Sequence, residues 1–257
     1  MRSALRLCLV PAMLVGLLLA FTSCGKGKPS TTTGATSISN KLAAITQAGQ
    51  PVTGKELDDW YAAPTDADNA AALYAQAFAA LTKDDPKSPA FLSRNQKALQ
   101  LLLQAAERKS CRYPVDLSAG FLATLSHLGN IKRCASLLEA EAVAQAGRGR
   151  TDQASKAVLA GLRLARSLEN EPVLISQLVR FVAERSALSG LEQALTRKPF
   201  EADQLLSLQA AQRDAGGLEF FARALAGERC SIIAGFQALP EDLVKVCADL
   251  RPDHDFV

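Results

Sequence analysis

The sequence predicts an all-α protein whose helices form an array of antiparallel hairpins. Apolar residues recur at helical spacing along most of the chain after residue 50. No segment shows the strict alternation or the clustered β-branched residues that are typical of strands. The connections between the expected helices are short, and short connections place consecutive helices side by side in opposite directions.

Residues 1–23 predict a secretory signal peptide. Arg2 and Arg6 form its basic start, and an apolar run over residues 7–21 follows them. This run is shorter than the roughly 20 residues that a membrane-spanning helix needs. We therefore expect an exported protein and leave this segment out of the predicted fold.

The tetrapeptide FTSC at residues 21–24 resembles the lipobox of bacterial lipoprotein signal peptides, with Phe21 in place of the usual Leu. The resemblance implies cleavage before Cys24 and attachment of acyl chains to that cysteine. Two or more acyl chains would anchor the protein stably to a membrane of the cell envelope. The alternative is ordinary cleavage after Ala20 or Ser23, which would release a secreted or periplasmic soluble protein.

Residues 24–50 predict a flexible tether that leads to a single helical domain over residues 51–257. The segment after Cys24 is rich in Gly, Ser and Thr and has no large apolar side chain before Ile38. Such a segment cannot bury enough apolar surface to fold, so we expect it to act as a flexible chain.

The composition and the motifs exclude several classes of ligand from the prediction. The chain has 29 basic and 26 acidic residues, so no nucleic acid partner is expected. It has two histidines and no C-x-x-C pair, so no metal site is expected. No glycine-rich phosphate loop or H-E-x-x-H motif occurs, so no cofactor is expected.

Start signals and periodicity place the helices in order. Thr53 and Glu56 form a capping box that starts a short helix, and Pro64 stops it. Asp68 can cap the second helix, and Ser88 can cap the third. Periodicity then predicts helices over residues 69–83, 90–109, 120–128, 130–147, 151–169, 173–195, 201–216, 218–236 and 241–250.

The segment from residue 138 to residue 161 resembles a tetratricopeptide repeat in its spacing. In that repeat, small side chains let two antiparallel helices approach closely, and larger ones fill the space between them. Glu141, Gln145 and Arg166 stand where the repeat has Leu, Tyr and Pro. The resemblance implies a tetratricopeptide-like array, either a degenerate solenoid or a compact bundle. The matching positions are Ala142, Gly149, Ala154 and Gly161 as small residues, with Leu138 and Val158 as larger ones.

A wider resemblance covers residues 57–236. The segments DNAAALYAQAF, SCRYPVDLSAG and SLENEPVLISQLVR, in this order, resemble an uncharacterised family of exported bacterial helical proteins. That family has no assigned activity or catalytic residues. The resemblance therefore implies a helical fold and export, and no reaction.

The cysteines leave two alternatives open. An exported protein can form disulfides, and Cys230–Cys247 is the first pairing we expect. In the other alternative, these residues fill apolar helix faces as free thiols, because unpaired Cys behaves as a small hydrophobic residue. The four cysteines that follow Cys24 are Cys111, Cys134, Cys230 and Cys247.

Few side chains suggest chemistry. A Ser/His/Asp or Cys/His arrangement would have to include His127, because His254 lies in the tail, and no nucleophile motif accompanies it. We expect His127 to pack or to cap a helix.

Two groups of residues are candidates for partner binding. Gln177, Arg180 and Glu184 recur at helical spacing and predict a polar line on one helix. This line either faces a partner or carries an Arg180–Glu184 pair on an exposed edge. Arg112 and Tyr113 lie in a loop that can present them to a partner, unless Tyr113 packs under the loop.

These observations favour a lipid-anchored envelope protein that binds a protein or peptide through a helical module, without catalysis. The alternatives are an envelope hydrolase acting on peptidoglycan or peptides through an unrecognised pair of carboxylates, and a purely structural spacer. The leader, the tether and the absence of catalytic motifs favour the first of these.

Overall fold

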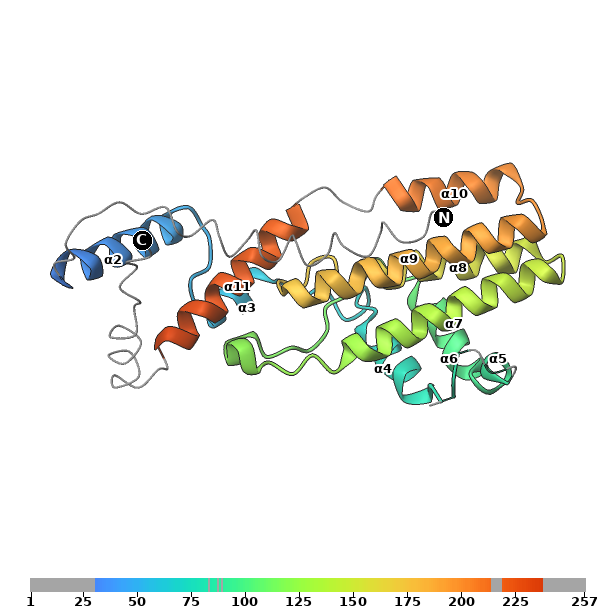
Figure 1. Ribbon diagram of the computed structural model, residues 1–257, viewed down its shortest axis with the longest axis horizontal. Coiled ribbons are helices and arrows are strands. Elements are labelled where there is room, and N and C mark those ends of the chain that lie inside the picture. The colour runs from blue at the N-terminus through green and yellow to red at the C-terminus, as the bar shows by residue number, and fades with distance from the viewer. Residues whose placement is uncertain (1–30, 83, 87, 89, 214–218, 238–257) are drawn as a thin grey trace, which may run out of the picture. The chain divides into compact units, whose positions relative to one another are not determined.

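The computed structural model describes residues 31–82, 84–86, 88, 90–213 and 219–237 (Figure 1). The all-α prediction is confirmed, because these residues form helices and no strand. The predicted signal peptide, the lipidation site Cys24 and the predicted helix over residues 241–250 lie outside them. The helices are α2 (Thr31–Gln47), α3 (Gly54–Trp60), α4 (Ala71–Ala80), α5 (Phe91–Arg94), α6 (Gln96–Ala105), the 3₁₀-helix η1 (Leu117–Leu122), α7 (His127–Gly147), α8 (Thr151–Arg166), α9 (Leu174–Arg197), α10 (Ala202–Arg213) and α11 (Glu219–Gln237).

The chain divides into two units, residues 1–44 and residues 45–257. Helix α2 runs through the end of the first unit, and its side chains from residue 37 onward are mostly exposed. Residues 31–47 of the predicted flexible tether form this helix. The second half of this segment, NKLAAITQ, contains Lys, Leu and Ala, which have high helix propensity.

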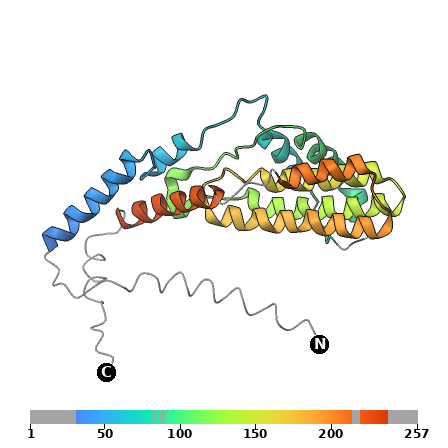
Figure 2. The ribbon, with the colours of Figure 1, turned by 90° about the horizontal axis from the view of Figure 1, so that it is seen from above.

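Helices α7, α8 and α9 pack pairwise against one another and form the centre of the second unit (Figures 1 and 2). Gly149 allows the tight turn between α7 and α8, because its φ of 75° lies in the left-handed region that favours glycine. Gly161 brings α8 close to α9: a Cβ atom there would lie 2.9 Å from the Cβ of Ala187. The chain therefore needs small side chains where these helices meet.

The buried face of the α7–α8 hairpin also carries polar residues. Glu141 and Gln145 are 8% and 9% exposed, and the Gln145 amide donates a hydrogen bond of 2.6 Å to the Glu141 carboxylate. These are two of the positions at which the sequence departs from the tetratricopeptide pattern. Their mutual hydrogen bond offsets part of the cost of burying them.

Helices α4 and α6 pack together, and the loop that follows α6 lies along the segment before α4. The backbone N–H of Ala70 donates to the Ser110 carbonyl at 2.9 Å, and that of Ser110 donates to Asp68 at 3.3 Å. The side-chain oxygen of Asn69 accepts from the backbone N–H groups of Ala71 and Arg112, each at 3.0 Å. Asn69, and not Asp68, therefore satisfies the start of α4.

Helix α11 packs on α9, α3 and η1, and α10 packs on α8. Gly227 in α11 lies against the chain before α9, where a Cβ atom would come within 1.7 Å of the Pro172 carbonyl oxygen. Only glycine fits this close approach.

One further local prediction is confirmed, and two predicted helices differ from the structure. The capping box is confirmed, because Thr53 accepts from the Glu56 N–H while the Glu56 carboxylate accepts from the Thr53 N–H. The helix predicted over residues 120–128 is wrong: Gly120 has a φ of 54°, which interrupts η1, and α7 starts only at His127. The helix predicted over residues 90–109 is divided at Asn95, where α5 ends and α6 begins.

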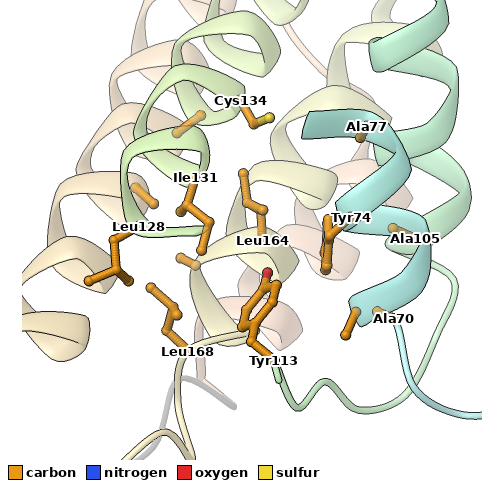
Figure 3. Close-up of a cluster of buried hydrophobic side chains, with 14 of the residues drawn as sticks. Ala70, Tyr74, Ala77, Ala105, Tyr113, Leu128, Ile131, Cys134, Leu164 and Leu168 are labelled. Atoms are coloured by element: carbon orange, nitrogen blue, oxygen red, sulfur yellow. The ribbon is translucent and has the colours of Figure 1, made fainter. Parts of the chain in front are cut away.

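The core of the second unit collects side chains from α4, α6, α7 and α8 (Figure 3). Cys134 lies in it, fully buried with a free thiol. Cys230 is also buried and free, and its Sγ donates to the Pro51 carbonyl at 3.3 Å. The predicted Cys230–Cys247 disulfide involves Cys247, which lies outside the described residues.

Candidate functional site

The fold brings together three side chains of the types that serve as acids, bases or nucleophiles in enzymes: His127, Glu171 and Ser176. The Nε2 atom of His127, the first residue of α7, lies 3.0 Å and 3.1 Å from the two oxygens of Glu171. The Ser176 hydroxyl donates a short hydrogen bond to the same carboxylate. Glu171 and Ser176 have no exposed surface, and His127 is 8% exposed.

Tyr113 joins this buried polar cluster through its ring. The ring stacks on the imidazole of His127, with the two centroids 4.4 Å apart. The Tyr113 hydroxyl lies 2.8 Å from the Ser167 Oγ, and Ser167 in turn donates to the Leu164 carbonyl. Because Ser167 uses its proton there, Tyr113 is the donor of the pair. Burial raises the pKa of the Tyr113 hydroxyl, so this donor stays protonated.

The cluster does not have the Ser/His/Asp arrangement of a catalytic triad. Ser176 and His127 both donate to the Glu171 carboxylate, whereas in a triad the histidine accepts from the serine and donates to the carboxylate. All three side chains are buried in the core. The arrangement stabilises the chain between α8 and α9, because it connects the start of α7 to the segment before α9.

The predicted polar line on α9 is corrected, because two of its members are buried. Gln177 has no exposed surface, and its amide donates to the carbonyls of Leu168 and Glu171, each at 2.9 Å. Gln177 therefore stabilises the turn that follows α8, and its side chain is too buried to contact a partner. Arg180 is 2% exposed, and its guanidinium lies over the Phe220 ring at 4.2 Å.

Glu184, the third member of that line, accepts a hydrogen bond of 2.8 Å from the Gln212 amide of α10. Together with Arg180 it borders a cavity of about 10 Å³, too small for a peptide. The alternative with an exposed Arg180–Glu184 edge is also wrong, because Arg180 is buried. Burial lowers the pKa of the Arg180 guanidinium, and the nearby Glu169 and Glu184 oppose this shift.

The two loop candidates also pack inward. Tyr113 is 3% exposed, so the alternative in which it packs under the loop describes it. Arg112 donates to the Asp58 carboxylate at 2.7 Å, and its guanidinium lies 4.7 Å from the centroid of the Tyr61 ring. Its side chain is 18% exposed. Arg112 therefore fastens the loop to α3 and is not displayed to solvent.

A pocket of about 380 Å³ opens beside this cluster, at the C-terminal ends of α6 and α8. Ala70, Tyr74 and Ala105 supply its apolar wall, and Ser167 connects it to the buried Tyr113 hydroxyl. Its charged side chains are Glu107, Arg108, Lys109, Arg163, Arg166 and Glu169.

Cys111 also lines this pocket and is half-buried. Burial raises the pKa of its thiol to about 12, and a nearby carboxylate, Glu171, acts in the same direction. The nearby Tyr113 hydroxyl partly opposes this shift of the pKa. Cys111 is therefore a neutral thiol at physiological pH and a poor nucleophile.

Sequence reasoning did not find this pocket or the roles of Glu171 and Ser176. One signal was present: basic residues lie near the C-terminal ends of two predicted helices, in ERKSC and in RLARS. Nothing in the sequence indicated that these two ends lie together.

Within the described residues, no group of His, Cys, Asp and Glu side chains could hold a metal ion. In the same part of the chain, no helix is both long and apolar enough to span a membrane. Comparison of the chain with protein-family models, with curated proteins and with solved structures finds no match. The two family resemblances in the sequence therefore stay expectations.

Proposed function

We propose that this chain is a lipid-anchored protein of the bacterial cell envelope whose helical domain binds a protein or peptide without catalysing a reaction. The observation that carries the binding role is the pocket between the ends of α6 and α8. This surface pocket is lined mainly by charged and polar side chains that come from two segments of the chain, so it can offer several polar contacts to one ligand. The buried polar cluster beside it has the geometry of a structural support.

A tetratricopeptide-like arrangement of the helical hairpins belongs to this proposal. Ala142, Ala154 and Gly161 are buried between helices, as the repeat requires of its small positions. Helix α9 packs on both α7 and α8, which extends the hairpin to a third helix. Such arrays are frequent in proteins that bind other proteins.

The anchor rests on the sequence alone. FTSC with its cysteine at position 24 supports lipidation of Cys24. The test is membrane fractionation of the wild type and of Cys24→Ser, with mass spectrometry of the mature N-terminus. We expect the wild type in the membrane fraction with an acylated N-terminal Cys24, and loss of acylation in the variant. An unmodified N-terminus at any other residue would contradict the anchor.

The binding role is tested by site-directed photo-crosslinking in bacteria that express the full-length chain. A photoreactive residue replaces Asn170, which is exposed at the pocket, or Arg185, which is exposed on α9 away from it. We expect a discrete crosslinked product from position 170 that is missing from position 185. The same products from both positions, or none from either, would contradict binding at this pocket.

A further inference from the structure

The charges around the pocket indicate what kind of ligand it takes, an inference that rests on the proposed function. Cationic side chains outnumber carboxylates at its wall. Arg163 and Arg166 come from the last turn of α8, and Arg108 and Lys109 come from the loop after α6. The carboxylates that face them are Glu107 and Glu169.

Part of this positive charge serves the fold itself. The C-terminal ends of α6 and α8 meet here, and each helix end acts as a partial negative charge of about half a unit. Arg163 donates to the Ala106 carbonyl at 2.6 Å and lies 3.8 Å from Glu107. Arg166 pairs with Glu169 at 3.4 Å, and Arg108 donates to the Ala67 carbonyl.

An excess of positive charge remains after these contacts. Lys109 is exposed at the pocket, and among the described residues it has no ion pair. The ion pairs of Arg163 and Arg166 are long and partly exposed, with side-chain exposures of 39% and 36% for the two arginines. Such pairs are weak, so a ligand with a negative group can replace their carboxylates at small cost.

The walls of the pocket are held in place before any ligand arrives. The loop with Arg108 and Lys109 is fastened by the backbone hydrogen bonds between Ala70 and Ser110 and between Ser110 and Asp68. The end of α8 is fastened by the Tyr113–Ser167 hydrogen bond. A ligand therefore meets cations on two segments that need little rearrangement, which lowers the entropic cost of binding.

We propose that this pocket binds a carboxylate of a peptide, either its C-terminal group or an Asp or Glu side chain. The planar fork of a guanidinium matches a carboxylate in two parallel hydrogen bonds. Ala70, Tyr74 and Ala105 line the pocket with at most 3% of their surface exposed, so recognition of the peptide depends on the charged side chains. A volume of about 380 Å³ is near the lower end of the range for small-ligand sites, which suits a short peptide segment.

The test is isothermal titration calorimetry on the full-length chain in detergent micelles. The probes are three N-acetylated heptapeptides of Ala, Ser and Leu: an amidated one, one with a free C-terminus, and an amidated one with a single Glu. We expect the second or third peptide to bind at least about tenfold more tightly than the first. Binding should weaken as the salt concentration rises from about 50 to about 300 mM, because salt screens the attraction between exposed charges.

A pair of double variants assigns the binding to the pocket. Lys109→Gln/Arg166→Gln removes two positive charges from it, and Arg185→Gln/Lys198→Gln removes two exposed charges from α9 and its end. We expect carboxylate-dependent binding to fall about tenfold or more in the first variant only. Thermal unfolding of both variants shows whether each remains folded. Equal binding by the two variants, both folded, would overturn the assignment to this pocket.

Other outcomes separate this inference from the proposed function. If all three peptides bind equally, the carboxylate is wrong while peptide binding stands. If inorganic phosphate binds the pocket and the peptides do not, the ligand class is also wrong. If no peptide binds but a discrete crosslink forms at position 170, the pocket does not recognise a peptide carboxylate. In that case the inference is wrong, while the proposed partner binding stands. If no peptide binds and no crosslink forms, both the inference and the proposed binding function are contradicted.

Discussion

The Nε2 atom of His127 lies within 3.1 Å of both carboxylate oxygens of Glu171, and the two side chains are buried although 44 residues separate them in the chain. Glu171 also accepts from Ser176, so one carboxylate connects the start of α7 with the first turn of α9. The Glu171 carboxylate thus holds two segments of the second unit together through buried hydrogen bonds.

The first prediction concerns Glu171→Gln. The amide replaces one carboxylate oxygen with an NH2 donor, so His127 and Ser176 can no longer both donate to a carboxylate, and their hydrogen bonds must weaken or rearrange. We expect the free energy of unfolding in urea to fall by about 2–4 kcal/mol. The matched control is Glu192→Gln on the exposed side of α9, with an expected change of less than about 0.5 kcal/mol. Equal, small effects of both changes would show that the cluster contributes little to stability.

The second prediction uses two glycines within helices. Gly227→Ala places a Cβ atom 1.7 Å from the Pro172 carbonyl oxygen, so α11 must move away from the segment before α9. We expect a loss of about 3 kcal/mol or more in the free energy of unfolding. Gly129→Ala in α7 meets nothing within 4 Å and should stabilise the protein by up to about 1 kcal/mol. Thermal and urea unfolding of the two variants check this difference in sign.

The third prediction concerns the contact between Arg112 and Asp58. Their salt bridge of 2.7 Å is only partly shielded, because the Asp58 side chain is 48% exposed. A double-mutant cycle with Arg112→Gln and Asp58→Asn should give a coupling energy of about 0.5–1 kcal/mol.

Arg112→Lys tests the stacking separately from the charge. Lysine keeps the positive charge but loses the planar guanidinium that lies over Tyr61. We expect it to recover less than half of the stability that Arg112→Gln loses. Full recovery by lysine would show that the charge alone accounts for the contact.

Features that depend on residues close to one another in the sequence could be predicted. The capping box at Thr53 and Glu56 is recognisable because both partners lie within one turn. The buried setting of Cys134 follows from its spacing with Ile131 and Leu138, all three of which are buried on α7. The turn at Gly149 is likewise local.

Features that depend on tertiary packing could not be predicted. Helical spacing shows that Gln177 and Arg180 share a face of α9, but it does not show what covers that face. The turn after α8 covers Gln177, and Phe220 of α11 covers Arg180. The approach of Glu171 to His127 brings together segments that carry no common local signal.

The last prediction concerns the thiol of Cys111, which lines the pocket. Only the thiolate reacts with iodoacetamide, and the pKa of this thiol is raised to about 12. At pH 8 the folded protein should therefore label at Cys111 on the order of a thousand-fold more slowly than an ordinary thiol. Between pH 7 and pH 10 the rate should rise roughly tenfold per pH unit without a plateau, because the whole range lies below the raised pKa.

Peptide mass spectrometry after timed labelling measures the rate at each cysteine. Cys134 provides the comparison, because its pKa is also raised to about 12 but its thiol has no exposed surface. Cys134 should label only when the protein opens, and an opened chain titrates near the ordinary thiol pKa of about 8.5. A plateau near that pH for Cys111 would mean that it too reacts through opening, and that the pocket does not admit the reagent in the folded state.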